Sequence, residues 1–350
     1  MNGSFDPTVS DSPCAVFDKI PDGFLDCPAA RLVDILPGPS LIELPGRDPQ
    51  PLFLSVLLHG NEDSGLLAVQ EALWRYRERE LPRALMIFVG NIRAAAAGVR
   101  TLPEQTDFNR VWPGTLTPQA SDARLAQWVY DHAKARKPFA SVDIHNNTGF
   151  NPHYSCITHL DPHFIALARL FSRIVVHFQR PVGTQAGAFA QFCPAITVEC
   201  GKAGAGSATA HAAELVEACL QMSHFPSHDT APQDVDLMRT YAIVKTPPGT
   251  SFSFDDAPAD FRFRADLDRL NFSELEAGAS FGVATPGSRL DVAPGDGEET
   301  PPADYFDYGA GEIRLTQSAI PAMLTLDSNA VRQDCLCYLM HRIGVDGKRL

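Results

Sequence analysis

Short apolar runs, many of them rich in β-branched residues, alternate with helical patterns between about residues 52 and 222, and this alternation constrains the fold more than any other feature. The apolar runs read LFLSVLL, LMIFVG, FASVDI, RIVVHF and AITVEC. Helical patterns lie at about 64–80, 121–135, 162–173 and 207–222. Strands that alternate with helices are typical of βαβ units around a largely parallel sheet. We therefore expect an α/β domain whose ligands bind beyond the carboxyl ends of its strands.

The pattern changes from residue 223 onward, where the polar, proline-containing stretch SHFPSHDTAPQDV indicates a domain boundary. Short strand-like runs follow, separated by Pro, Gly and Asp, as in a small, mainly β domain. They are YAIVKT, SFSF, FRFRADL, SFGVAT and EIRLT. We interpret 285–304 as an exposed loop and about 328–343 as a last helix that packs back on the body. The chain would then divide into an α/β domain with an N-terminal extension at 1–225 and a mainly β domain at 226–350.

The composition is that of an ordinary globular protein, with 45% apolar and 20% charged residues. The formal net charge of −13 argues against nucleic-acid and anionic-membrane partners, which attract basic surfaces, and any anionic substrate would need a local cluster of arginines. No stretch reaches the roughly 18 apolar residues of a membrane span, and the first residues do not resemble a secretory signal, so we expect a cytoplasmic location. The eight cysteines contain no CxxC pair and are expected to be reduced and mostly buried.

Residues with metal-binding chemistry follow three of the predicted strands. LLHGNEDSG places His59 and Glu62 three positions apart, SVDIHNNTG ends a strand with Asp143 and His145, and AITVECG ends another with Glu199. An HxxE pair can supply two metal ligands from one loop, although a capping glutamate beside a partly buried histidine would give the same letters. The other two strand ends favour the metal-binding interpretation, because the ends of neighbouring parallel strands converge.

Hydrolytic zinc sites take three protein ligands of the His₂Glu kind and leave a fourth position open for water. His59, Glu62 and His145 fit that set. Asp143 lies on the same strand face as His145 and would either orient its imidazole or accept backbone N–H groups. Glu199 is the candidate carboxylate for moving a proton between water and a leaving group, the alternative being a buried charge paired with an arginine. Cys200 should point to the opposite face of the strand, as a buried thiol.

A long loop at 90–114, GNIRAAAAGVRTLPEQTDFNRVWPG, supplies the candidate substrate-binding groups. An arginine here could bind a carboxylate bidentately or stabilise an oxyanion near the metal, although most loop arginines are simply solvated. Phe108 and Trp112 flank the polar pair Asn109 and Arg110, which indicates a loop held down by aromatic packing with Arg110 presented inward.

The order of these motifs resembles the succinylglutamate desuccinylase/aspartoacylase branch of the zinc carboxypeptidase superfamily. The motifs are HGNE, then GN followed by R and by DFNR.WPG, then DIHNNTG, and finally VECG. The resemblance covers about 52–220. It implies a zinc-carboxypeptidase-like three-layer α/β/α domain with a mixed, largely parallel sheet at 1–225. It also implies that the smaller, mainly β domain at 226–350 caps the active site.

Carried over position by position, the resemblance implies that His59, Glu62 and His145 bind one Zn²⁺ per chain. It also makes Glu199 the general base that then acts as the acid.

The resemblance further implies that Arg100, with Arg93 as the alternative, polarises the scissile carbonyl. Asn109 and Arg110 would hold a substrate carboxylate. Aspartoacylases carry an arginine shortly before the catalytic glutamate, but the corresponding GTQAGAFAQFCPA contains none. An N-acyl aspartate is therefore not a favoured substrate.

The function expected on these grounds is zinc-dependent hydrolysis of the amide bond in a small N-acyl amino acid. Two alternatives stay open: a zinc carboxypeptidase that acts on short peptides, and a non-catalytic zinc-binding protein of the same fold. The partner is then a small-molecule substrate, with no nucleic acid or membrane, and the sequence leaves the oligomeric state open.

Overall fold

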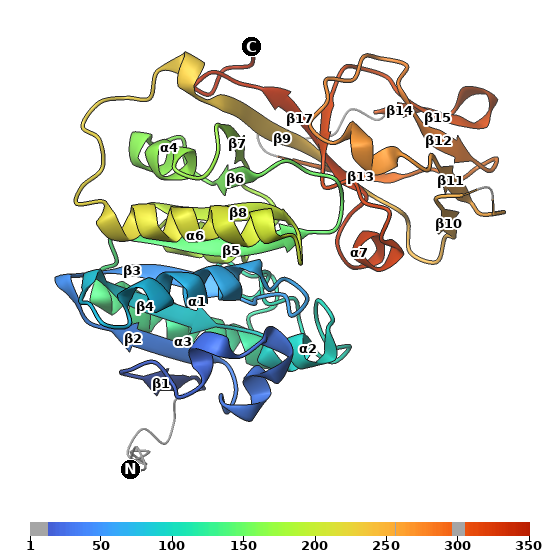
Figure 1. The fold of residues 1–350 in the computed structure, drawn as a ribbon. Coiled ribbons are helices and arrows are strands. Elements are labelled where there is room, and N and C mark those ends of the chain that lie inside the picture. Colours follow the sequence, from blue (N-terminus) through green and yellow to red (C-terminus); the bar gives the residue numbers. More distant parts are fainter. Residues whose placement is uncertain (1–12, 256, 296–304) are drawn as a thin grey trace. The chain divides into compact units, whose positions relative to one another are not determined.

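The computed structural model describes residues 13–255, 257–295 and 305–350 (Figure 1). These residues form two compact units. The first comprises the chain up to His145 together with Pro181–Ala195 and Ala212–Ser223, and the second comprises Asn146–Arg180, Ile196–His211 and His224–Leu350. The predicted fold class is confirmed, because a mixed, largely parallel sheet with helices is accompanied by a β-rich C-terminal region. The division at 225/226 stays a prediction.

The first unit contains strands paired in the spatial order β1, β2, β4, β3, β5. Their bounds are β1 (Ala15–Phe17), β2 (Ser40–Leu44), β3 (Gly46–Val56), β4 (Leu81–Val89) and β5 (Ala140–Asn147). The β2–β4 pair is antiparallel, and the β3–β4 and β3–β5 pairs are parallel. The second half of β3 and all of β5 are buried, as expected for parallel strands covered on both faces.

The second unit contains strands paired in the order β8, β6, β7, β9, β17, β16, with β13 also paired to β9. Their bounds are β6 (Tyr154–Ile157), β7 (Ile174–His177), β8 (Ala195–Lys202), β9 (Asp236–Lys245), β13 (Asp291–Pro294), β16 (Ile320–Ala322) and β17 (Cys337–Arg342). A separate sheet of short strands has the order β10 (Phe252–Ser253), β11 (Phe261–Phe263), β12 (Ser280–Ala284), β15 (Glu312–Leu315) and β14 (Phe306–Asp307).

The predicted helices of the α/β domain are present, with somewhat different ends. They are α1 (Ser64–Tyr76), α3 (Ser121–Arg136), α4 (Pro162–Arg169) and α6 (Gly206–Gln221). Two short helices were not predicted: α2 (Ile92–Ala97), inside the expected loop at 90–114, and α5 (Gln185–Phe189). Within the described residues, no helix has both the length and the apolar character of a membrane span.

The predicted helix at 328–343 is wrong over most of its length. Only α7 (Ser328–Gln333) is helical, and β17 follows it. Asp334 leaves the helical region with φ −126° and ψ −86°, and the next apolar residues pair antiparallel with β9 and are largely buried. Burial against a neighbouring strand therefore outweighs the weak helical periodicity of this stretch.

The predicted exposed loop at 285–304 is wrong at Asp291–Pro294, where β13 pairs antiparallel with β9, whereas residues 285–290 form the expected turn and loop. Residues 296–304 of that prediction lie outside the described part of the chain.

Candidate metal centre

The HGNE turn follows β3 directly and owes its shape to two backbone features. Leu57 takes a positive φ of 54°, which turns the chain away from the strand. A Cβ on Gly60 would lie 2.2 Å from the backbone carbon of Ala94 in α2, so only glycine allows this helix to approach the turn. The backbone N–H of Gly60 also donates to the carbonyl of Arg100, which fixes the later loop against the turn.

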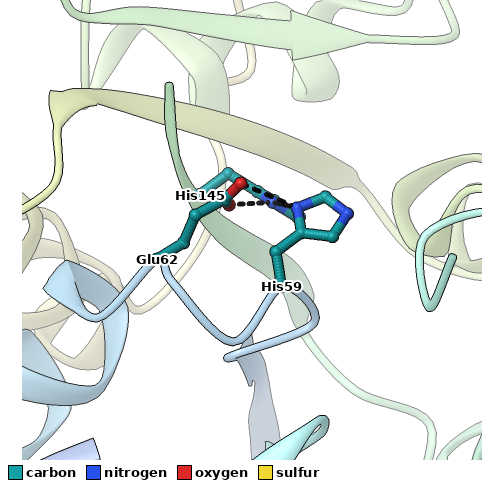
Figure 2. A group of neighbouring side chains, drawn as sticks. All are labelled: His59, Glu62 and His145. Atoms are coloured by element: carbon teal, nitrogen blue, oxygen red, sulfur yellow. Dashed lines mark hydrogen bonds and ion pairs between the residues drawn. The ribbon is translucent and has the colours of Figure 1, made fainter. Parts of the chain in front are cut away.

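The structure brings His59, Glu62 and His145 together in the first unit, with all three side chains buried (Figure 2). The Glu62 carboxylate lies across both rings, with Oε1 2.8 Å from Nδ1 of His59 and Oε2 2.7 Å from Nδ1 of His145. The two Nδ1 atoms are 3.1 Å apart. One ligand atom from each residue lies within 4.8 Å of the others.

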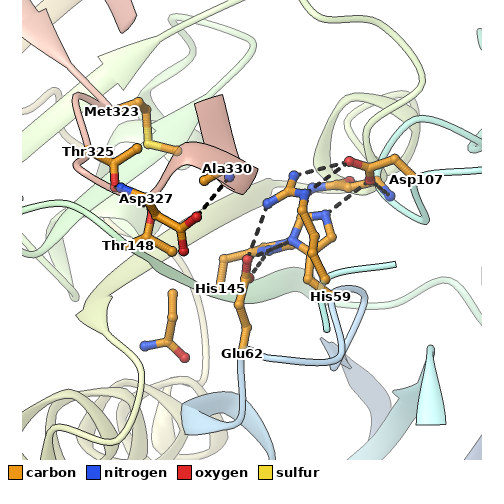
Figure 3. Close-up of polar contacts among 12 residues, drawn as sticks. His59, Glu62, Asp107, His145, Thr148, Met323, Thr325, Asp327 and Ala330 are labelled. Atoms are coloured by element: carbon orange, nitrogen blue, oxygen red, sulfur yellow. Dashed lines mark hydrogen bonds and ion pairs between the residues drawn. The ribbon is translucent and has the colours of Figure 1, made fainter. Parts of the chain in front are cut away.

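The far side of each imidazole faces an aspartate. Nε2 of His59 is 3.0 Å from Oδ1 of Asp107 (Figure 3), and Nε2 of His145 is 2.7 Å from Oδ2 of Asp143. A carboxylate can only accept, and each imidazole has one on both sides: an aspartate at Nε2 and Glu62 at Nδ1. The hydroxyl of Ser55 donates to the other oxygen of Asp143 at 2.6 Å, beneath the site.

Charge balance inside the cluster shifts three pKa values. Burial alone raises the pKa of Glu62, but His59 and His145 hold it below its ordinary value. Burial also opposes ionisation of Asp107, whose pKa is nevertheless lowered by His59 and Arg100. Burial would lower the pKa of His145, yet Asp143 and Glu62 raise it well above its usual range. Glu62 and Asp107 therefore favour their ionised forms, and His145 favours its protonated form.

The cluster suits a metal cation by its donor set and by its geometry. Two imidazole nitrogens facing one another at 3.1 Å repel unless a positive charge lies between them. Tetrahedral Zn²⁺ with Zn–N bonds of about 2.0–2.1 Å separates its ligand atoms by roughly 3.3 Å, close to that spacing. Aspartates behind both histidines match the carboxylate–histidine–zinc arrangement that orients metal-binding imidazoles. The predicted residues thus fit a zinc ion.

Of the two candidate arginines, the structure places Arg100 at the cluster. Its guanidinium donates to Glu62 at 3.3 Å and to Asp107 at 3.0 Å, and its side chain is 16% exposed. Arg93 projects from α2, pairs with Glu104, and is 64% exposed. Arg100 is therefore the arginine that contacts the cluster of His59, Glu62 and His145.

The loop that carries Asn109 and Arg110 is held down by aromatic packing, as predicted. Trp112 is 1% exposed, donates from Nε1 to the carbonyl of Phe108, and packs edge-on against Phe88. The buried side chain of Asn109 donates to Asp143 at 3.2 Å.

Asn109 also accepts the backbone N–H of Gln185 at 2.8 Å, so its amide links the loop to α5. Arg110 is partly buried and donates to the carbonyl of Asn109.

Glu199 belongs to the second unit, where it lies on β8 opposite Tyr154 of β6. Burial, followed by the charge of Glu199, raises the pKa of Tyr154 well above its usual range. The neighbouring Cys200 is fully buried, in line with its predicted position on the other face of the strand. Six of the eight cysteines are buried, as expected.

Two residues that support the cluster were not predicted from the sequence, Asp107 and Ser55. Asp107 begins the DFNR motif, of which only Asn109 and Arg110 were predicted to have a role, and Ser55 lies in an apolar strand. The signal for Ser55 was its polar character inside LFLSVLL, as the penultimate residue of β3. No pattern signalled Asp107, because its partner His59 is 48 residues away.

Residues 50–223 match the family model described as the succinylglutamate desuccinylase/aspartoacylase catalytic domain. The chain belongs to this family. The resemblance carried by HGNE, DFNR, DIHNNTG and VECG is thereby confirmed, and the matched segment contains every candidate site residue. No curated protein matches the chain in sequence.

Solved structures of this family share the fold. The succinylglutamate desuccinylase of Chromobacterium violaceum is 21% identical with a TM-score of 0.54, over 76% of this chain and 90% of that one. Murine aminoacylase 3 is 15% identical with a TM-score of 0.57, and the match covers 85% of this chain and 97% of that one. The product-bound ectoine utilization protein of Ruegeria pomeroyi is 14% identical with a TM-score of 0.56, and the match covers 87% of this chain and 88% of that one. At these identities the similarity establishes the fold alone.

Proposed function

We propose that the protein is a zinc-dependent hydrolase that cleaves the amide bond of a small N-acyl amino acid. The observation that carries the proposal is the convergence of two imidazole Nδ1 atoms and one carboxylate, with an aspartate behind each ring. Membership of a family named for a desuccinylase and an aspartoacylase supports the same reaction class. His59, Glu62 and His145 would hold the ion.

A bound zinc ion would supply Lewis acidity and lower the pKa of a water molecule towards about 7. Amide cleavage also requires proton transfer, because the leaving nitrogen departs readily only as a protonated amine. Glu199 has that role in the proposal: its carboxylate accepts a proton from the attacking water and gives it to the nitrogen.

Arg100 would stabilise the oxyanion that develops on the scissile carbonyl. Its guanidinium is held by Glu62 and Asp107, so it enters the reaction already oriented. A preorganised donor of this kind stabilises the transition state without reorganisation during the reaction.

The substrate carboxylate would be bound by Arg110 with Asn109. The stretch from Gly183 to Ala195 carries no arginine, and its helix α5 is packed inward through Gln185, Ala186 and Phe189. This segment offers no cation for an acidic substrate side chain. The amino acid released should therefore be less acidic or larger than aspartate.

The test is release of free amine from a panel of N-acetyl, N-succinyl and N-formyl amino acids by the zinc-loaded protein. Glu199→Gln should bind zinc as the wild type does and lose turnover, whereas Glu104→Gln, which removes an exposed carboxylate, should stay active. Activity retained in Glu199→Gln would remove Glu199 from the mechanism. Efficient trimming of long peptides would favour the carboxypeptidase, and tight zinc without hydrolysis of any member would favour the non-catalytic protein.

A further inference from the structure

Three basic residues form a row across adjacent strands of the second unit. His177 on β7 is the register partner of Arg239 on β9, and Arg239 is the register partner of His341 on β17. Figure 1 shows these three strands side by side. Register partners on neighbouring strands project to the same face of a sheet, so the three side chains share one surface.

Arg349 adds a second guanidinium to this row. The chain returns after β17 so that Arg349 forms a bridge with Ile343. Its charge is close enough to His341 and to Tyr241 to affect the pKa of both. Tyr241 is two residues along β9 from Arg239 and stacks on His341 with ring centroids 5.4 Å apart.

No carboxylate neutralises the two arginines within the described part of the chain. Among the described residues, the side chain of Arg239 makes a long hydrogen bond from Nε to Nδ1 of His177 at 3.4 Å. Arg349 forms no ion pair with any described residue. Arg342, directly after His341, differs because it is paired with both Asp236 and Glu274. In a protein with a formal net charge of −13, two arginines that act on one histidine and make no ion pair among the described residues are unexpected.

Two further details concern the immediate surroundings of the row. Gly347 packs beside Arg239, because a Cβ at this position would lie 3.1 Å from Nη2 of the guanidinium. Nδ1 of His341 is buried and has no hydrogen-bond partner among the described residues. Buried polar atoms normally have a hydrogen-bond partner, so the lack of one at Nδ1 of His341 indicates a bound group from outside the protein.

The local electrostatics fit an anion. Burial, together with Arg349 and Arg239, lowers the pKa of His341 to about 4. Burial and Arg239 likewise lower the pKa of His177 to about 4. At neutral pH both imidazoles are therefore uncharged, but an uncharged imidazole still donates one N–H. The two guanidiniums supply the positive charge.

The row is remote from Glu199 within the second unit. Along β6, Tyr154 pairs with Glu199 and Ile157 pairs with His177, three residues further on. Three residues span about 10 Å, and Arg239 is three strands away from β8 at about 4.8 Å per strand. The row is thus separate from the proposed catalytic carboxylate.

We propose that Arg239, Arg349 and His341 form a binding site for a phosphate group. Guanidinium forks bind phosphate oxygens in parallel pairs, and the imidazole N–H supplies a third donor. The group could be free inorganic phosphate or the phosphate of a small ester, which present the same oxygens to the three side chains. The site is independent of the proposed hydrolase activity.

The experiment is a titration of the zinc-loaded full chain, followed by NMR of protein with isotope-labelled histidine rings. Inorganic phosphate, glycerol phosphate and succinate are added separately, and the His341 signal is assigned by its loss in His341→Gln. Inorganic phosphate should shift the His341 signal saturably. Tighter binding of glycerol phosphate would identify an ester as the source, and succinate binding tighter than phosphate would overturn the assignment.

Substitutions of the arginines test whether phosphate binds at this site. Arg239→Gln should weaken phosphate binding about tenfold or more, as loss of one charge-assisted contact predicts. Because Arg239 is partly buried, the exposed Arg349→Gln is a second variant with the same expectation. Arg342→Gln, whose charge is already neutralised by Asp236 and Glu274, should change binding less than twofold. Absence of a saturable shift, or a shift unchanged in both Arg239→Gln and Arg349→Gln, would overturn the proposal.

Discussion

The cluster of His59, Glu62 and His145 in the first unit and the arginine–histidine row of the second contain similar side chains with opposite charge balance. In the cluster, the two imidazoles are surrounded by Glu62, Asp107 and Asp143, with Arg100 as the paired cation. Carboxylates outnumber guanidiniums three to one there, so the cluster attracts positive charge. In the row, two guanidiniums face no carboxylate of the described residues, so the missing charge is negative.

The comparison shows that histidine alone does not indicate what a site binds. The pKa of His145 is raised by carboxylates, whereas burial and arginines lower the pKa of His341. An imidazole backed by a carboxylate directs a lone pair at a metal, and one beside guanidiniums offers an N–H to an anion. The surrounding charges decide between the two.

The largest expected effect comes from removing the carboxylate that bridges both rings. Glu62→Gln should weaken zinc binding by more than about 100-fold, because loss of a ligand exceeds the 10–100-fold cost of losing an outer partner. Competition with a chromophoric chelator measures the affinity, with Glu104→Gln as the exposed control. Zinc held equally tightly by Glu62→Gln would place the metal elsewhere.

The next prediction compares two arginines that lie seven residues apart. Arg100→Gln should lower kcat/KM about 10²–10³-fold, as removal of one oxyanion donor does, with zinc still bound. Arg93→Gln removes the same charge from an exposed ion pair and should stay within twofold. Steady-state kinetics on the best substrate of the panel distinguish them, and a larger effect at Arg93 would reverse the assignment.

A smaller effect is expected behind the metal ligands. Asp107→Asn should weaken zinc binding about 10–100-fold, since the neutral amide no longer holds His59 Nε2–H with a full charge. Asp131→Asn, which alters an exposed carboxylate on α3 bonded to Gln127, is the matched control. Chelator competition again gives the affinities, and equal values for both variants would assign Asp107 to structure alone.

The smallest effect concerns the hydroxyl beneath the cluster. Ser55→Ala removes a buried donor to Asp143 and should lower the free energy of unfolding by about 1–3 kcal/mol, with zinc affinity reduced less than tenfold. Ser121→Ala, at an exposed position, should change stability by less than about 0.5 kcal/mol. Urea denaturation of both variants measures this. A Ser55→Ala protein as stable as Ser121→Ala would show that Asp143 is held without the hydroxyl.

Much of the metal cluster could be predicted from local sequence because strand geometry places it. His59 and Glu62 follow β3, and His145 lies near the end of the parallel neighbour β5, so hydrogen bonding between the strands brings them together. The α/β alternation was equally readable, since buried parallel strands require continuous apolar runs. The helix expected at 328–343 failed because its last residues were better buried by pairing with β9.

The sequence by itself therefore determined the fold class, the order of the motifs and the residues that converge on the cluster. The tertiary structure decided which distant groups surround them: Asp107 behind His59, Arg100 in place of Arg93, and the row that joins His177, Arg239 and His341. The physical reason is the distance along the sequence between the residues that make contact. Periodicity and spacing encode contacts within an element or at the ends of adjacent strands, whereas charge partners that are 38 or more residues apart are selected only by packing.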